Sequence, residues 1–309
     1  MPKANFPITP ELTAIAIGYS NEKMIADQVL PRVPVGKQEF KYMKHTMAEG
    51  FTLPDTKVGR KSSPNKVDFS ATETTDSTED HGLEDDIPMT DIANAPEGYD
   101  PKGKSTVQLT NLIELRREKR IADLVFDANQ YGAAYKETLA GNDQWSDAAN
   151  SDPVAKIMDS LDVVIMRPNV MTIGRAAFTM LARHPKIVKA IHGNSGDSGI
   201  ARRQDIAELF ELDELLVGEG WLNTAKKGQA PNMVRVWGKH CALIHRDMNA
   251  DTNFGATFGY TAQFGTRIAG ANPNPDIGLR GGETVRVGES VKELITANDL
   301  AFFLQNVVA

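Results

Sequence analysis

The sequence lacks most features of a disulfide-linked, membrane-bound or secreted chain. Cys241 is the one cysteine among 309 residues, which excludes an internal disulfide and a thiolate cage for a metal ion. Aromatic residues make up only 7%, and the longest apolar run, residues 300–304, is far shorter than the roughly 20 residues of a membrane-spanning helix. The first ten residues contain no apolar signal segment. We therefore expect a soluble, unsecreted protein of a reducing compartment, without a membrane partner.

Positive charge is absent from one long segment. Residues 73–100 contain ten Asp or Glu residues and no Lys or Arg. Since the net charge of the chain is −7, the remainder carries +3, too small an excess for a surface that binds nucleic acid by counterion release. The segment is expected to be a solvated loop or sheet edge, or else a docking strip for basic residues. Such residues flank it on both sides: Lys57, Arg60, Lys61 and Lys66, then Arg116, Arg117, Lys119 and Arg120.

The first seventy residues indicate an arm and a hairpin. Five prolines around the apolar stretch 12–17 predict that residues 1–35 form an extended arm with one turn of helix. Alternating apolar and polar residues predict strands over 39–43 and 67–70. Between them, residues 45–64 read as a long exposed hairpin tip, which is either functional or disordered.

Apolar residues at three- and four-residue spacing predict one long helix over residues 111–140. Asn111 could cap its start and Gly141 could end it. Such a helix spans about 45 Å, more than the roughly 19 Å radius of gyration of a compact chain of this length, so it would serve as the backbone of the fold. From residue 152 the pattern alternates between helices, expected over 154–165, 176–182 and 187–191, and strands, the first expected over 170–173, which indicates a second α/β unit. Residues 285–308 predict a strand that enters a buried sheet.

One segment fits a catalytic motif. Residues 98–105, GYDPKGKS, match the glycine, four residues, Gly-Lys-Ser pattern of phosphate-binding loops. That site requires a buried strand before the loop, whereas the preceding DIPMTDIANAPE is acidic and contains two prolines. We expect an exposed turn here and keep a nucleotide-binding enzyme as the weaker alternative.

Other candidate sites have the wrong spacing. The six histidines include no pair at the spacing of a zinc protease, and the calcium-like pattern from Asp247 has Thr252 and Phe258 where glycine and glutamate are needed. Cys241 lies in an apolar run and reads as a buried small hydrophobe. We expect no catalytic residue, no metal and no cofactor, and hence no enzyme.

Three stretches resemble a known family. They are IADQVLPRVPVGKQEFKYMKH at 25–45; EDHGLEDDIPMTDIANAP at 79–96 with LIELRREKRIADLVFD at 112–127; and LVGEGWLNTA with VWGKHCALIHRD between 216 and 247. These stretches occur in the order that is typical of the family. Over nearly its whole length, the sequence resembles the tailed-bacteriophage major capsid proteins of the Hong Kong 97-type fold.

The resemblance implies an α+β fold of five parts. These are an N-terminal arm (1–35), an extended hairpin loop (36–72), a peripheral domain (73–151) with a spine helix at about 111–140, an axial α/β domain (152–249) and return strands of the peripheral domain (250–309). Some members of the family crosslink a loop lysine to a neighbour, but no partner asparagine can be located in this sequence. Scaffolding by a separate protein and a chain already close to its mature form both stay open.

The resemblance also implies a function. The chain would assemble with its own copies into hexamers and pentamers of an icosahedral head that encloses double-stranded DNA without tight sequence-specific binding. Separate scaffolding, portal and decoration proteins would be further partners, and the chain would reside in the virion after assembly in the host bacterial cytoplasm. The alternative shell is an encapsulin-like nanocompartment that encloses cargo protein.

An arm and a loop that bury little in their own subunit can recover that burial against another copy. The candidate inter-subunit contacts are Phe51, Leu53, Lys57, Arg60, Lys61, Glu84, Asp85, Asp86, Arg116 and Arg117.

Overall fold

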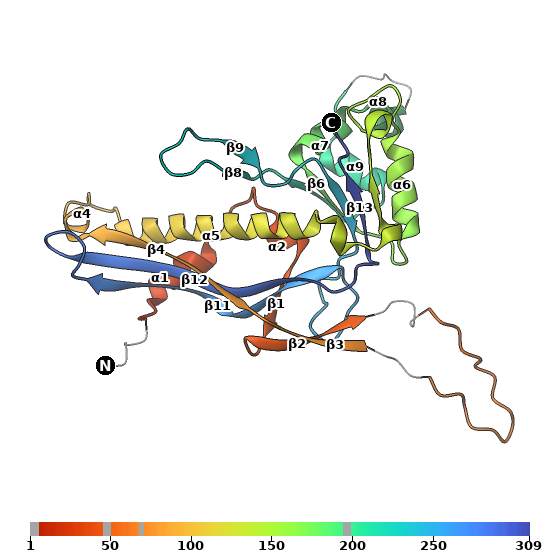
Figure 1. Cartoon of the computed structure of the whole chain (residues 1–309), viewed down its shortest axis with the longest axis horizontal. Coiled ribbons are helices and arrows are strands. Elements are labelled where there is room, and N and C mark those ends of the chain that lie inside the picture. Colours follow the sequence, from red (N-terminus) through yellow and green to blue (C-terminus); the bar gives the residue numbers. More distant parts are fainter. Residues whose placement is uncertain (1–5, 46–50, 68–70, 194–198) are drawn as a thin grey trace.

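A computed structural model describes residues 6–45, 51–67, 71–193 and 199–309. The molecule is elongated: a long sheet with a helix along it forms the body, an α/β lobe stands at one end, and a loop extends beyond that end (Figure 1). Its solvent-accessible surface is 17612 Å², whereas a compact monomer of this mass exposes about 12,700 Å². The chain thus presents far more surface than a compact monomer would.

The helices differ greatly in length. Their bounds are α1 (Pro10–Gly18), α2 (Ala26–Val29), α4 (Met89–Ala93), α5 (Pro101–Val125), α6 (Pro153–Val163), α7 (Arg175–Arg183), α8 (Pro185–His192) and α9 (Arg203–Leu209), with 3-10 turns η1 (Ala128–Gln130), η2 (Ala133–Tyr135) and η3 (Gly141–Asp143). Within the described ranges, no helix combines the length and the apolar character needed to cross a membrane.

The body is a four-stranded sheet of order β1-β11-β12-β4, formed by β1 (Arg32–Val35), β11 (Gly259–Asn274), β12 (Gly282–Ile295) and β4 (Glu79–Pro88). β1 runs parallel to β11, and the other pairs are antiparallel. Helices α1 and α5 cover one face, where Leu12 and Ile113 pack with Val285 and Val287. This leaves β4 at one edge of the sheet.

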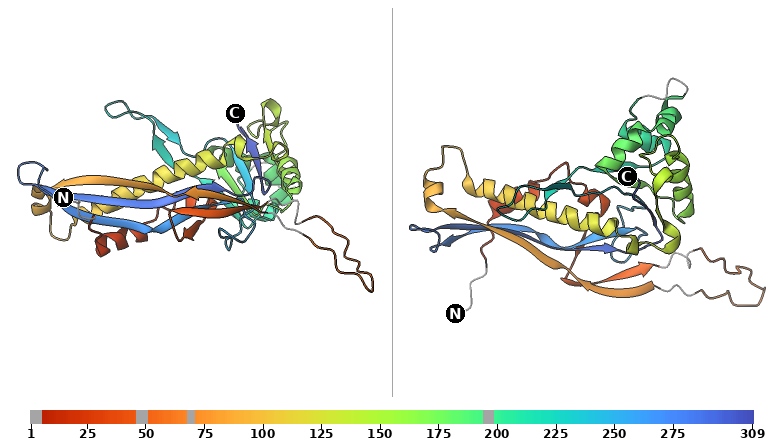
Figure 2. Two further views of the ribbon diagram at one scale, coloured as in Figure 1. Left: turned by 60° about the horizontal axis from the view of Figure 1, so that its bottom comes forward. Right: turned by 45° about the horizontal axis from the view of Figure 1, so that its top comes forward.

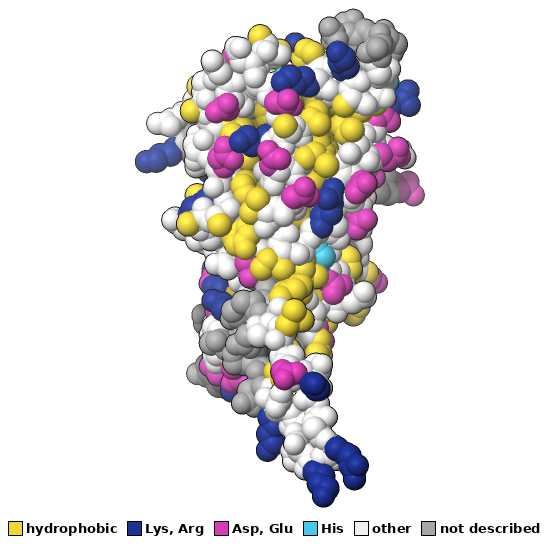
Figure 3. Space-filling model, turned by 90° about the vertical axis from the view of Figure 1, so that its right-hand side faces the viewer, with side chains coloured by type: hydrophobic (Ala, Val, Ile, Leu, Met, Phe, Trp, Pro, Cys, Tyr) yellow, Lys and Arg dark blue, Asp and Glu magenta, His cyan; other side chains and the backbone are white. Residues whose placement is uncertain are grey.

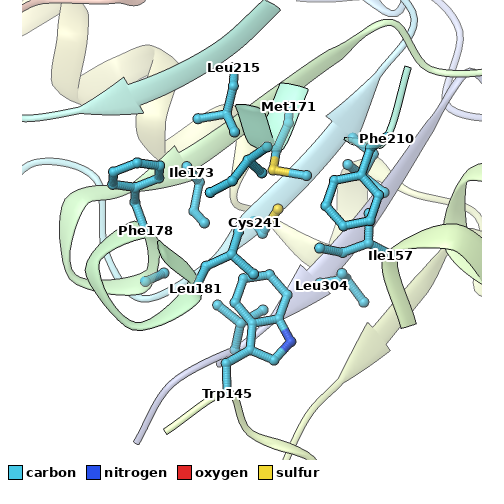
Figure 4. Close-up of a cluster of buried hydrophobic side chains, with 14 of the residues drawn as sticks. Trp145, Ile157, Met171, Ile173, Phe178, Leu181, Phe210, Leu215, Cys241 and Leu304 are labelled. Atoms are coloured by element: carbon cyan, nitrogen blue, oxygen red, sulfur yellow. The ribbon is translucent and has the colours of Figure 1, made fainter. Parts of the chain in front are cut away.

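The lobe at the end contains a five-stranded sheet of order β5-β13-β10-β6-β7, formed by β5 (Lys136–Thr138), β13 (Ala301–Gln305), β10 (Cys241–Ile244), β6 (Val170–Gly174) and β7 (Glu214–Gly218). Side chains from α6 to α9 fill its core with those of the strands, and Figure 4 shows Ile157, Phe178 and Cys241 among them. A Cβ on Gly218 would lie 2.1 Å from the Trp237 ring, so the strand needs glycine there. The lobe therefore has a closely packed core of its own.

Two separate hairpins project from these layers. β2 (Glu39–His45) pairs with β3 (Ala71–Ser77), and β8 (Trp221–Asn223) pairs with β9 (Met233–Arg235). The second predicted strand, 67–70, is displaced: residue 67 is not in a strand, 68–70 lie outside the described residues, and pairing begins at Ala71. The acidic segment itself thus supplies β3 and the edge strand β4.

The long helix is real, but its predicted bounds are wrong. It begins at Pro101 because the Asp100 carboxylate accepts the N–H groups of Lys102 and Gly103, each at 3.0 Å, and proline fits the first position. It ends at Val125, whose carbonyl accepts the Tyr131 hydroxyl at 2.6 Å. Apolar residues recur up to residue 139 because Tyr131 and Leu139 are buried in the hydrophobic cores, although neither of them is in the helix.

The expectation that the arm buries little in its own subunit is also wrong for the described residues. Leu12 and Ala16 are buried against the long sheet and α5, and Val29 and Leu30 are buried against α5 and strands of the lobe. Thr9 donates its N–H to the carbonyl of Ala269 at 3.0 Å on β11. The sequence around residues 9–35 is therefore part of the subunit's own fold.

The chain end divides between the two sheets. Residues 250–309 were expected to be return strands of one domain. β11 and β12 do belong to the long sheet, but β13 lies between β5 and β10 in the lobe. Its nearly all-apolar sequence, AFFLQ, suits that buried central position. The run of residues 285–308 thus does enter a buried sheet, but it is divided between β12 and β13.

Candidate assembly surfaces

The described part of the loop between β2 and β3, residues 51–67, is the most exposed part of the described chain. It projects away from both sheets (Figure 1), and Phe51 and Leu53 are 58% and 96% exposed. Val58 and Val67 are exposed as well. Several exposed apolar side chains on one short segment are typical of a surface that a partner covers.

The loop is also basic. Residues 51–67 contain four Lys or Arg residues and one carboxylate, and Figure 3 shows Lys and Arg side chains at its tip. Asp55 organises the loop, since its carboxylate accepts the Lys57 N–H at 2.9 Å and its carbonyl accepts the Asn65 amide at 2.8 Å. Lys57, Arg60 and Lys61 are all exposed. The predicted contact residues of the loop thus lie on one protruding element.

The acidic candidates lie on β4, but they do not share one face. Glu84 pairs with Arg286, and Asp86 accepts the Thr284 hydroxyl at 2.6 Å. Asp85 instead accepts the hydroxyl of Ser105 on α5 at 2.6 Å. All three thus have a partner in their own subunit. Glu84 and Asp86 are bound to β12 and remain candidate contacts on one side of the strand, whereas Asp85 is directed toward α5.

Arg117 was a wrong candidate for a contact with another copy. The residue is 1% exposed, its side chain pairs with Asp27, and its guanidinium donates to the Thr261 hydroxyl at 3.0 Å. Burial lowers the pKa of this guanidinium. The adjacent Arg116 is exposed on α5. Neighbouring residues on a helix lie about 100° apart, so one of them faces the core and the other faces solvent.

Buried ion pairs fasten the arm to the sheet. Glu289 on β12 pairs with Arg32 at 2.9 Å and with Arg267 at 3.1 Å, and Arg267 also pairs with Glu114 at 3.1 Å. Burial alone would raise the pKa of Glu289, but the two guanidinium groups hold it below its ordinary value. For Glu114 burial prevails over Arg267 and raises the pKa.

Glu118 joins three parts of the chain. Its carboxylate accepts the N–H groups of Ile25 and Ala26, at 3.0 and 2.8 Å, and the Trp237 indole N–H at 2.5 Å. Burial raises its pKa, although these hydrogen bonds favour the charged form. Sequence reasoning missed this carboxylate. The available signal was a charged residue on the apolar side of the predicted helix.

The segment that matches a phosphate-binding loop is engaged in other contacts. Its last five residues form the first turn of α5, so the expected turn covers only residues 98–100. Asp100 already accepts the N–H groups at the helix start, Ser105 is bound to Asp85, and the Lys104 ammonium lies 5.3 Å from the centre of the Tyr99 ring. The strand before it, β4, is an edge strand. These contacts occupy the groups that would cradle a phosphate.

The remaining candidates for chemistry do not converge. In the described ranges no three His, Cys, Asp or Glu side chains are placed to hold a metal ion. Cys241 is fully buried in the lobe, and burial raises the pKa of its thiol. The surfaces, rather than a cleft, thus carry the features that call for a partner.

The fold defines a class of protein. A phage-related protein from Bordetella bronchiseptica superposes with a TM-score of 0.78 at 23% identity, covering 98% of this chain and 99% of that one. A subunit of the mature capsid of bacteriophage PhiM1 gives a TM-score of 0.53 at 11% identity, covering 93% and 88%. The protein therefore has the Hong Kong 97-like fold of phage capsid subunits, as the α+β prediction stated.

Sequence comparison gives the family. The model described as phage major capsid protein E matches residues 122–220. The major capsid protein of Pseudomonas phage JBD67 is 58% identical over 309 residues, covering 100% of both chains. The chain belongs to the phage major capsid proteins, structural components of the virion that build a multi-subunit shell. The cargo-compartment alternative is not favoured, because these sequence relatives are phage proteins.

Proposed function

We propose that the chain assembles into hexamers and pentamers of a phage head, in which the basic loop of one copy docks against the acidic β4 edge of a neighbour. The proposal is supported chiefly by the loop itself, where Leu53 is 96% exposed beside a cluster of cations. Within one subunit the loop points away from β4 (Figure 1). A neighbouring copy can supply the burial and the opposite charge that the loop lacks in its own subunit.

In this proposal the two halves of the contact have separate roles. Phe51 and Leu53 supply apolar burial, and Lys57, Arg60 and Lys61 face Glu84 and Asp86 of the neighbour. Arg116, the remaining candidate contact, is exposed on α5 but is not part of this docking of the loop on β4. The five-part division of the chain is kept as part of the proposal, with β13 assigned to the axial domain.

The shell encloses packaged double-stranded DNA without sequence-specific binding, and its role is structural rather than catalytic. Assembly takes place in the host bacterial cytoplasm with separate scaffolding, portal and decoration proteins. A chain of net charge −7 suits a wall that does not hold its contents tightly.

Deletion of residues 46–63 tests the role of the loop. We expect the variant to fold, with an unchanged melting temperature, and to fail to form shells in negative-stain micrographs. Normal shells from the deletion would contradict the docking role.

A charge exchange tests the partner surface. Lys57→Glu with Lys61→Glu should block assembly, as should Glu84→Lys with Asp86→Lys, because each places like charges opposite one another. All four changes together should restore shells. If the combined variant kept its fold by circular dichroism but formed no more shells than either double variant, the loop would dock on a surface other than β4.

A further inference from the structure

One side of the body carries unneutralised positive charge. The outer stripe of α5 presents Lys104 and Arg116, both exposed, and the half-buried Lys119, opposite the side that packs on the sheet. The β8–β9 hairpin projects beside that stripe, away from the long sheet (Figures 1 and 2). Its residues 221–235 include Lys226, Lys227 and Arg235 and no carboxylate.

A third segment completes this side. The connection between α1 and α2 is tied to α5, because the Tyr19 hydroxyl and the Asn21 amide both donate to the side-chain oxygen of Asn111, at 3.0 Å. This connection adds Glu22 and Lys23, both exposed. We call the three segments together the basic face; it comprises Lys23, Lys104, Arg116, Lys119, Lys226, Lys227 and Arg235, with Glu22 and Asp123.

Seven cations against two carboxylates contrast with the negative charge of the chain as a whole. Lys119 is the member with a carboxylate partner, Asp123. Arg235 stacks 4.3 Å from the centre of the Trp221 ring. Within the described residues, Arg116, Lys226 and Lys227 have neither an ion pair nor a ring contact. Their charge is available to an outside partner.

The layout of the charges points to the partner. From Lys104 to Lys119 the cations on α5 extend over about 22 Å of helix, and the hairpin cations lie beside them. Leu112, Trp221 and Met233 are exposed among these cations. The charges nevertheless extend along the helix and the hairpin, as suits a polyanion of regular charge spacing, and are not gathered around one apolar anchor as in a compact protein interface. We propose that the basic face lines the interior of the shell and contacts the phosphate backbone of the packaged nucleic acid. This inference rests on the proposed function and assigns the inner side of the subunit.

The contact is weak and independent of sequence. About five net charges bind duplex DNA only at low ionic strength, because the affinity falls steeply as salt competes for the phosphates. This agrees with a wall that confines DNA without holding it. It also leaves the acidic β4 edge and the basic loop for contacts between copies.

Duplex binding by unassembled subunits tests the proposal. We expect a 40-base-pair duplex of arbitrary sequence to bind at 50 mM salt by fluorescence anisotropy and to dissociate toward 200 mM. The variant Arg116→Gln, Lys226→Gln, Lys227→Gln should bind about tenfold more weakly, with a slope of log affinity against log salt that is shallower by about 2 to 3. The matched control, Lys57→Gln, Arg60→Gln, Lys61→Gln, removes the same charge from the loop and should bind as the parent does.

Three results would overturn the inference: no duplex binding by the parent, binding by the Arg116, Lys226, Lys227 variant that equals the parent's, or loss of binding in the loop control alone. Polyglutamate serves as a second probe, and binding of polyglutamate without the duplex would assign the face to an acidic protein. Because the readout uses unassembled subunits, it is independent of shell formation. Formaldehyde crosslinking in filled particles should then join DNA to peptides that contain Lys226 and Lys227, and crosslinks confined to residues 51–67 would contradict the assignment.

Discussion

The sequence predicts that the arm and the loop both protrude from the subunit, yet in the structure the arm is buried and the loop is exposed. Leu30 in the arm is fully buried, whereas Leu53 in the loop is 96% exposed. The arm is held by the Glu118 carboxylate and by ion pairs to the sheet, while the hydrogen bonds of Asp55 are made within the loop itself. The difference separates a segment that completes the fold from a segment that is left for a neighbour.

The two adjacent arginines of α5 provide the largest expected contrast. Arg117→Ala removes one partner of a buried charge network and should lower the free energy of unfolding by about 3–5 kcal/mol. Arg116→Ala, one residue earlier and exposed, should change it by no more than about 0.5 kcal/mol. Urea unfolding of the subunit measures both. Similar losses in the two variants would contradict the assignment of Arg117 to the interior.

A leucine pair compares the two segments directly. Leu30→Ala creates a cavity between the arm and α5 and should cost about 2–5 kcal/mol in unfolding free energy. Leu53→Ala should leave the free energy of the subunit within about 0.5 kcal/mol and reduce the yield of shells instead. If Leu53→Ala destabilised the subunit as much as Leu30→Ala, the loop would belong to the fold in the same way as the arm.

The fastening of the arm should depend on pH through Glu289. Its pKa lies below the ordinary value, so its charge stabilises the fold above about pH 4.5, and this contribution is lost as pH falls through the lowered pKa. Glu289→Gln should cost about 1.5–3 kcal/mol at pH 7, and the gap from the parent should narrow below about pH 4.5. Glu84→Gln on the exposed side of the same sheet is the matched control, expected within about 0.5 kcal/mol. A gap for Glu289→Gln that stayed constant down to pH 3 would contradict this role.

Local pattern predicted the lobe well. The helices expected over 154–165, 176–182 and 187–191 and the strand over 170–173 are confirmed by α6, α7, α8 and β6, because the apolar pattern of each lies within its own segment. In α6 and α8 a proline also marks the first position of the helix. The Hong Kong 97-like fold, which the family resemblance implied, is confirmed by the comparison with solved structures. Patterns of this kind suffice where an element packs against its sequence neighbours.

The errors occurred where a distant residue decides the outcome. The arm is bound to the subunit by hydrogen bonds to Glu118 and Ala269, which lie more than ninety residues away in sequence. The end of α5 depends on Tyr131. Its position continues the apolar spacing of the helix, yet it lies beyond the helix, and its hydroxyl donates to the carbonyl of Val125, the last helical residue. Arg117 and Arg116 have the same chemistry in sequence, and only the packing of α5 distinguishes them. The loop contacts with a neighbouring copy stay a prediction.

The most direct test of the contrast between arm and loop is a cryo-electron microscopy map of the assembled shell. We expect Phe51 and Leu53 of one copy to lie on a neighbouring subunit, with Lys57 and Lys61 near Glu84 and Asp86 there, and residues 10–35 to cover their own sheet. A loop folded back on its own subunit, or an arm that crosses to the neighbour, would contradict the account.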